Sequence, residues 1–360
     1  MTEIAPPQRG RERPASARPD ISAPFRRPAH EVPGPLPPAG PVPVELVESL
    51  VATAARAPSL HNTQPWRFRP GSGGLELIAD PSRILAGIDP AGRELLISCG
   101  AALFGLRLAV RQAGYRPVVS LLPDPAQPAL LACVRLGAAA PMTSAERQLL
   151  AAVPHRHTHR GAFEPEPVAA SLLARLQRAA AAEGATLCYV EQPDHYLQLA
   201  ALVAEADGRL QADQAVLHHT RSWTRRIGDA ARDGVPAHAF PPPRHPQAGR
   251  LAQRDFDLGR DVGLLDSSGE TPTATAVLVT VADGPADWLR AGQALHRLLL
   301  HAASRWVFAS LHSQPLELPV LRAEIRSRLA LPGAPQMILQ LGRARTAAVT
   351  ARRPPADLLD

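Results

Sequence analysis

The stretch RELLISCGAALFGLRLAVRQAG, residues 93–114, decides the fold that the sequence predicts. It is apolar on most faces of a helix, and Gly114 follows it as a typical helix stop. A helix that is apolar all round is normally buried on all sides. We therefore expect this helix to lie at the centre of the protein, with other layers covering it.

Working outward from this helix, periodicity predicts helices and strands on both sides of it. Before it and just after it we expect a helix at 46–54 and strands at 74–80, 116–123 and 129–137. Beyond them, a cap at Thr143 or Ser144 with Glu146 begins the next helix. Further along we expect helices at 168–183, 194–206, 287–305 and 319–331 and strands at 185–191, 273–281 and 335–343. The similar element order of the two rounds permits a pseudo-duplicated architecture, although no residue-level repeat is visible.

Two segments fall outside this pattern. Residues 1–43 are crowded with proline, which removes backbone donors, so we expect a disordered or extended arm that is not part of the fold. Residues 209–270 combine Gly, Pro, His, Arg and Asp with weak periodicity. An irregular insert of this length is typical of a lid, a binding loop or a disordered excursion.

Composition excludes several classes of protein. The chain has 360 residues, a formal charge of +6 and 45% apolar residues, which fits a globular protein of two linked units. All basic residues are Arg, but they form no basic helix, so a solvated surface is favoured over nucleic-acid binding. No apolar run is long enough for a membrane span, and no secretory signal is recognisable. The three separated cysteines fit reduced core thiols in a cytoplasmic protein.

Residues 154–163, PHRHTHRGAF, offer two kinds of ligand chemistry. His155, His157 and His159 alternate as on a strand, but the interleaved arginines would repel a cation, so we expect no metal site. Arginine forks and a hydroxyl match the oxygens of a phosphate instead. The residues of this anion-site hypothesis are Arg156, His157, Thr158 and Arg160. A solvated polar turn before a helix remains the alternative.

The second polar bend is APSLHNTQPWRF, residues 57–68. Asn62 and Gln64 carry carboxamides, which donate and accept together and suit the edge of a planar heterocycle. Pro58 and Pro65 stiffen the bend on either side. The alternative is a well-capped helix end whose side chains bond the local backbone.

At this point four separated motifs resemble the FMN-dependent nitroreductase superfamily. Residues 58–66 are similar to its P-S-x-x-N-x-Q-P-W loop, and RHTHRGAF is similar to its arginine motif for the flavin. SQPLE at 313–317 resembles the segment that approaches flavin N5, and ARRP at 351–354 resembles the basic end that binds phosphate. Their order and wide separation are similar to the Acg family of actinobacterial nitroreductase-like proteins, over roughly residues 44–357.

This resemblance implies an α+β, nitroreductase-like fold. Two tandem halves, 44–140 and 141–360, would imitate the nitroreductase homodimer in one chain, so a monomer is expected and a dimer remains possible. A single FMN site would lie between the halves. The residues implied for it are Pro58, Ser59, Leu60, Asn62 and Gln64 from the first half, and Arg156, His157, Thr158, Arg160, Pro315, Leu316, Glu317, Arg352 and Arg353 from the second.

The function implied is that of an oxidoreductase. Hydride would pass from NADPH or NADH to flavin N5 and then to a flat small-molecule acceptor such as a nitro compound or a quinone. No catalytic side chain is required, because the flavin performs the hydride transfer. The alternative that the resemblance leaves open is a flavin-sequestering protein whose lid covers the site and whose turnover is low. No nucleic acid, membrane or metal partner is expected.

Overall fold

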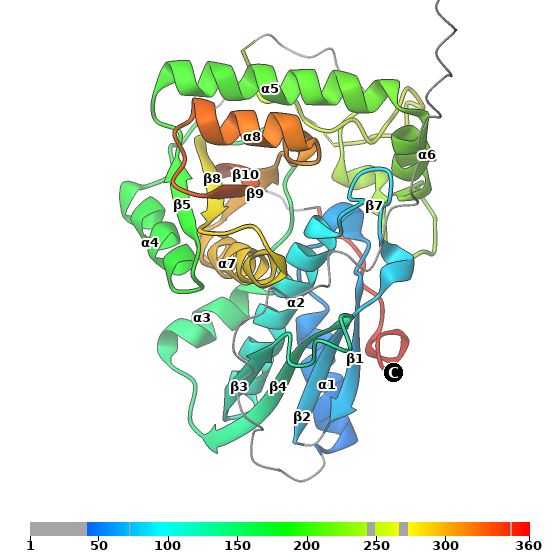
Figure 1. Ribbon diagram of the computed structural model, residues 1–360, viewed down its shortest axis with the longest axis vertical. Helices are drawn as coiled ribbons and strands as arrows, with labels where there is room; N and C mark the ends of the chain where they lie inside the picture. Colours follow the sequence, from blue (N-terminus) through cyan, green and yellow to red (C-terminus); the bar gives the residue numbers. More distant parts are fainter. Residues whose placement is uncertain (1–41, 72, 243–248, 266–272, 346–347) are drawn as a thin grey trace, which may run out of the picture.

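The structure is a computed structural model, and the parts of the chain that it describes lie between residues 42 and 360 (Figure 1). The described ranges are 42–71, 73–242, 249–265, 273–345 and 348–360. The prediction of a disordered arm at 1–43 therefore falls almost entirely outside the described residues. No described helix is long and apolar enough to cross a membrane.

Two long helices form the centre of the molecule, as predicted for the first of them. Helix α2 (Arg93–Gln112) and helix α7 (Pro285–Ala303) lie side by side between two sheets (Figure 1). They cross at two glycines. A Cβ atom added to Gly292 would lie 1.9 Å from Ile97 O, and one added to Gly100 would lie 2.2 Å from Leu289 O. Only glycine therefore permits this backbone approach.

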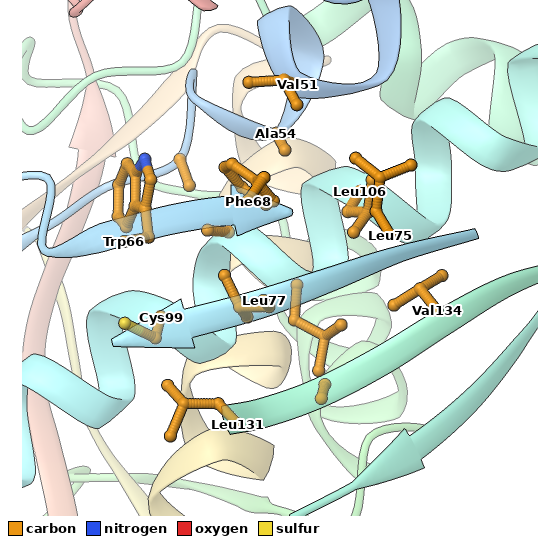
Figure 2. Close-up of a cluster of buried hydrophobic side chains, with 14 of the residues drawn as sticks. Val51, Ala54, Trp66, Phe68, Leu75, Leu77, Cys99, Leu106, Leu131 and Val134 are labelled. Atoms are coloured by element: carbon orange, nitrogen blue, oxygen red, sulfur yellow. The ribbon is translucent and has the colours of Figure 1, made fainter. Parts of the chain in front are cut away.

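The first sheet is antiparallel throughout, with strand order β1-β2-β4-β3. Its strands are β1 (Trp66–Gly71), β2 (Gly74–Ala79), β3 (Tyr115–Leu121) and β4 (Leu130–Ala139). Helix α1 (Val44–Ala54) packs with α2 on this sheet, and their apolar side chains form one core (Figure 2). Trp66 and Phe68 of β1 are fully buried in that core and anchor the strand that follows the polar bend.

The second sheet has the order β5-β8-β10-β9 and is also antiparallel. Its strands are β5 (Thr186–Tyr189), β8 (Ala274–Thr280), β9 (Val307–Leu311) and β10 (Ala334–Arg343). Helices α4 (Ala170–Ala181) and α7 cover one face, while α5 (Pro193–Ala212) and α8 (Pro319–Arg328) cover the other. Helix α3 (Ser144–Ala152) begins with a capping box of Thr143 and Glu146, which confirms that predicted helix start.

Most predicted helices and strands are confirmed, but the start of the irregular insert is wrong. Helix α5 continues to Ala212, and α6 (Gln214–Ser222) follows at once. The Asp213 carboxylate starts α6 by accepting hydrogen bonds from the N–H groups of Ala215 and Val216. Between α6 and residue 265, the described residues form only short regular elements. These are β6 (Thr224–Arg225), β7 (Val235–Pro236) and η4 (Ala237–Ala239).

Two segments cross from one layer of the molecule to the other along sheet edges. Thr158 pairs with Ala309 of β9, and Leu359 pairs with Phe68 of β1. The C-terminal strap, defined here as residues 349–360, therefore lies beside the first sheet (Figure 1). Its backbone hydrogen bonds to β1 run from Phe68 N to Leu358 O at 2.7 Å and from Asp360 N to Phe68 O at 2.9 Å.

Buried histidines give the stability of this fold a defined pH dependence. Burial lowers the pKa of His296 on α7 to about 3 and that of His312 to about 4, from an ordinary value of 6.5. Below pH 6.5 these histidines bind protons in the unfolded chain but stay neutral in the folded protein. The free energy of unfolding therefore decreases as the pH falls. We expect the free energy of unfolding in urea to drop by about 2 kcal/mol for each histidine between about pH 7 and pH 5. In a His296→Asn variant the free energy of unfolding should decrease less over this pH range. An equal decrease would show that His296 does not contribute to the pH dependence.

Candidate functional site

The polar bend adopts an unusual backbone conformation. His61, Asn62 and Gln64 have φ angles of 46°, 56° and 50°, in the left-handed region that favours glycine. Hydrogen bonds hold this strain in place: Ser59 Oγ accepts from Gln64 N at 3.0 Å, and Ser98 Oγ of α2 accepts from Leu60 N at 3.1 Å. Such strain is typical of functional sites.

The main cavity lies against this bend and has an atom-free volume of about 660 Å³. Parts of the chain that are far apart in sequence share its wall. They are the polar bend, α2, the 156–160 segment, α7, the strands β9 and β10, Ser313 shortly after β9, and the insert. The lining residues are Pro58, Ser59, Leu60, His61, Glu94, Ile97, Ser98, Thr158, Arg160, Gln253, Arg254, Phe256, Leu295, Leu311, Ser313 and Met337. Five residues of the sequence hypothesis, Pro58, Ser59, Leu60, Thr158 and Arg160, are thus brought together.

The insert closes over this cavity through residues 252–256. The Phe256 ring meets the His61 ring edge-on at 5.0 Å, and the Arg160 guanidinium lies 5.1 Å from the centre of the Phe256 ring. Gln253 Nε2 donates to Ser310 Oγ at 2.9 Å, and Ala252 O accepts from Gln314 Nε2 at 3.2 Å. The insert is therefore held to the second sheet by hydrogen bonds and covers the cavity with an aromatic ring.

A smaller pocket of about 220 Å³ gathers three arginines, and we call it the arginine pocket. Its lining residues are Arg56, Pro154, Arg156, His157, Val349, Thr350 and Arg352. Arg156 donates to Arg56 O at 3.1 Å, while its Nε has no partner. Arg352 donates to Ala57 O at 3.2 Å and to Thr350 Oγ1 at 2.5 Å. No carboxylate among the described residues pairs with any of the three guanidiniums.

The electrostatics of the arginine pocket favour an anion. Burial, reinforced by repulsion from Arg56, lowers the pKa of Arg156 to about 10. Burial and repulsion from Arg156 and Arg56 lower the pKa of Arg352. Both groups stay cationic at neutral pH, and a buried cation without a partner is costly. The His157 ring, neutral because burial lowers its pKa to about 3, leaves both nitrogens without a partner. A phosphate group would satisfy these donors, so the residues fit that part of FMN.

The three alternating histidines lie on aromatic rings. Ring centroids are 5.6 Å apart for His155 and Trp306, 4.6 Å for His157 and Phe308, and 4.8 Å for His159 and Phe163. Within the described part of the chain no group of three or more His, Cys, Asp or Glu side chains is placed to hold a metal ion. The alternation therefore serves packing against aromatic neighbours, chiefly on and beside β9.

Asn62 and Gln64 make contacts other than those expected of a ring-binding pair. Asn62 Nδ2 donates to Gly234 O at 3.0 Å and to Ala351 O at 3.1 Å, and its Oδ1 has no partner. Gln64 Nε2 donates to Arg232 O at 2.8 Å, and its Oε1 accepts from Arg353 N at 2.8 Å. Neither lines the main cavity. The two carboxamides join the bend to the insert and to the C-terminal strap.

Residues 315–317 also differ from their expected role. The N–H groups of Leu316 and Glu317 both donate to Ser313 O within the turn η5 (Gln314–Leu316), so they are not free for a ligand. The Glu317 carboxylate pairs with Arg254 of the insert and accepts from Ser313 Oγ at 2.8 Å. Pro315 is buried beside them. Residues 313–317 therefore hold the insert in place. Among these five residues, Ser313 alone lines the main cavity.

Several residues that line the two pockets were not predicted from the sequence. Arg56 lies just after α1 and carries no motif, while Arg254 and Phe256 lie in the insert without periodicity. Glu94 looked like one polar position on an otherwise apolar helix. The one signal that the sequence offered for Glu94 was a charged residue within a helix that is apolar on most faces.

The Gln64 contacts carry a testable consequence. Gln64→Leu would remove the side-chain partner of Arg353 N and of Arg232 O, two partly buried hydrogen bonds worth about 1 kcal/mol each. We expect trypsin to cleave the native variant faster after Arg232 than it cleaves the unaltered protein. Gln177→Leu is the matched control, because Gln177 is exposed and makes one long bond of 3.4 Å. Equal cleavage rates of both variants would contradict the role of Gln64 in joining the polar bend to the insert and the C-terminal strap.

Comparison with known proteins agrees with this fold. A Mycobacterium tuberculosis protein named as a candidate NAD(P)H nitroreductase is 35% identical over 304 residues, covering 83% of this chain and 86% of the relative. A second protein of that organism, named as the candidate NAD(P)H nitroreductase acg, is 27% identical over 310 residues, covering 84% and 90%. No family model matches the chain.

Two solved structures are also similar. A candidate nitroreductase from Anabaena variabilis has 13% identity and a TM-score of 0.41, covering 84% of this chain and 88% of that one. A Desulfitobacterium hafniense nitroreductase with bound FMN has 16% identity and a TM-score of 0.36, covering 60% and 97%.

The mixed α/β fold, its central cavity and these relatives define a nitroreductase-like protein. Within that class, the chain belongs to the Acg family of the FMN-dependent nitroreductase superfamily.

Proposed function

We propose that this protein is an FMN-dependent oxidoreductase that accepts hydride from NADPH or NADH and passes it to a flat acceptor, such as a nitro compound or a quinone. The observation that carries the proposal is the arginine pocket, where three guanidiniums have no carboxylate partner among the described residues. A cofactor with a phosphate at one end and a planar ring at the other matches this pocket and the main cavity. The names of the relatives support the same chemistry.

The proposal assigns each group of residues a task. Arg56, Arg156 and Arg352 would hold the phosphate, with His157 as a neutral donor beside them. Thr158 and Arg160 would face the ribityl chain, and residues 58–61 would form one wall of the ring site. Bound FMN would supply the hydride chemistry itself. The protein would place the ring, keep bulk water out with Phe256, and leave room for the reactants in turn.

We also propose that the two sheets correspond to tandem halves, 44–140 and 141–360, that together build one cofactor site. Each half contributes a four-stranded antiparallel sheet and one central helix, and α2 packs on α7 where the halves meet. Because both sides of the cavity come from the same chain, a monomer would be complete. Sedimentation of the FMN-loaded protein tests this, and a stable dimer whose subunits lose FMN on separation would overturn it.

The decisive experiment on function uses the purified full chain. We expect it to take up FMN stoichiometrically and the flavin absorbance to bleach when NADPH or NADH is added without oxygen. Menadione or nitrofurazone should then restore the absorbance. FMN that bleaches with dithionite but with neither nucleotide would indicate sequestration instead of turnover. A protein that takes up no FMN would contradict both functions.

A further inference from the structure

A second cavity lies next to the main one and has an atom-free volume of about 1020 Å³. Its wall comes from the start of α2, the turn η5 and α8. Exposed residues form part of this wall, among them Pro90, Pro319 and Arg326, so the second cavity is accessible to solvent. Of the described residues, only Glu94 lines both cavities.

Glu94 lies in the wall between the two cavities, and most of its surface is buried against protein. It lies in the first turn of α2 and is 2% exposed. Its Oε1 accepts a hydrogen bond from Arg93 Nη2 at 2.7 Å. Ser98 links the backbone of the same turn to the polar bend. Its Oγ donates to Glu94 O at 2.7 Å and accepts from Leu60 N at 3.1 Å. Glu94 is thus positioned by the same contacts that shape the main cavity.

The charges around Glu94 leave one carboxylate in excess. The innermost carboxyl groups are those of Asp89, Glu94 and Glu317, against the guanidiniums of Arg93 and Arg254. Arg254 pairs with Glu317, and Asp89 accepts from Leu95 N at 2.8 Å. Three more charged groups lie on neighbouring elements. Asp207 on α5 accepts from Gln211 Nε2 at 2.8 Å, Arg322 on α8 pairs with Asp283, and Arg160 lines the main cavity. One proton retained by this inner set would bring its net charge to zero.

Burial decides where that proton resides. It raises the pKa of Glu94 to about 8, against the opposing attraction of Arg93 and with the help of the Glu317 and Asp89 charges. Asp89 is raised less, to about 6, because Arg93 and the amides at the start of α2 stabilise its anion. A carboxyl group that remains protonated at neutral pH is suited to donate a proton.

We propose that Glu94 is the proton donor of the main cavity and that it regains its proton from water in the second cavity. The inference rests on the function proposed above. Conversion of a quinone to a hydroquinone takes one hydride, supplied by the reduced cofactor, and one proton. The proton would leave the Glu94 carboxyl for the acceptor oxygen, leaving a carboxylate. A proton from bulk solvent would then return to it through the water of the second cavity. The carboxyl group is restored, and each turnover consumes one hydride and one solvent proton.

The kinetic test compares Glu94→Gln with Glu183→Gln in the FMN-loaded protein. Glu183 is a matched control, because it is a buried glutamate held by Arg107 and Arg297 away from both cavities. For quinone reduction, we expect kcat of the unaltered protein and of Glu183→Gln to fall above about pH 8. Glu94→Gln should be about 100-fold slower and independent of pH over that range. A Glu94→Gln profile that matches the unaltered protein would overturn the inference while leaving the oxidoreductase function standing.

A second measurement does not depend on turnover. The infrared spectrum of the cofactor-free protein at neutral pH should contain the carbonyl band of a protonated carboxylic acid. This band should disappear in Glu94→Gln, persist in Glu183→Gln, and be lost from the unaltered protein above about pH 8. A spectrum that Glu94→Gln leaves unchanged would refute the donor role even if FMN binds and bleaches. Failure to bind FMN would instead refute the function on which the inference rests.

Discussion

Arg156→Met weakens FMN binding by about 100-fold, which is the largest functional effect that we expect from a single substitution. Arg156 is 5% exposed, and its guanidinium makes one hydrogen bond to a backbone oxygen, so most of its donors remain for a ligand. Methionine keeps the length and apolar body of the side chain and removes only its charge and donors. Fluorescence titration of FMN into the cofactor-free protein measures the loss.

The same substitution should stabilise the protein when FMN is absent. A buried cation without a carboxylate partner destabilises the fold, and its replacement by an apolar side chain is expected to raise the free energy of unfolding by about 1–3 kcal/mol. Arg209→Met is the control, because Arg209 is exposed and pairs with Glu205 on α5. A stability loss with unchanged FMN affinity would show that Arg156 is structural and would contradict the phosphate assignment.

Gly292→Ala destabilises the fold by about 3 kcal/mol, the largest effect on stability that we expect. The added methyl group would lie 1.9 Å from Ile97 O and 2.7 Å from Ala101 N of the facing helix. These atoms belong to the α2 backbone and cannot move aside as a flexible side chain would, so the two central helices must separate. Urea unfolding followed by circular dichroism provides the measurement.

Gly208→Ala on α5 is the matched control for the helix crossing. A Cβ atom at this position meets no heavy atom within 4 Å, so only the helix preference of alanine acts. We expect Gly208→Ala to raise the free energy of unfolding by about 0.5–1 kcal/mol. Equal effects of both substitutions would mean that the α2–α7 crossing tolerates a wider separation than the structure indicates.

The sequence predicted the elements of this fold better than it predicted their contacts. Helix α2 was recognisable because its apolar residues surround it, and the capping box at Thr143 marked the start of α3. Strand β9, VFASL, has four successive buried residues and therefore lacks the alternation that identifies a half-exposed strand. The extension of α5 was missed because the polar residues on its outer face obscured the buried positions Ala206 and Leu210.

For the candidate site, short motifs predicted the residues near the cavity but not their individual tasks. Pro58, Ser59, Leu60, Thr158 and Arg160 line it, whereas the side chain of Gln64 is occupied by protein backbone. A carboxamide can bind a ring edge or a peptide group equally well, so its residue type alone cannot decide between them. Contacts across hundreds of residues, such as those of the insert, have no periodic signature in the sequence.

The C-terminal strap also sets an order of events during synthesis. Residues 358–360 hydrogen-bond to Phe68 at the edge of the first sheet, and Arg352 completes the arginine pocket. Until the ribosome has made the strap, the β1 edge of a nascent chain is open to pairing with other chains, which is a route to aggregation. The phosphate contact proposed for Arg352 would be missing for the same period. If Arg352 holds the phosphate as proposed, FMN binding should follow docking of the strap.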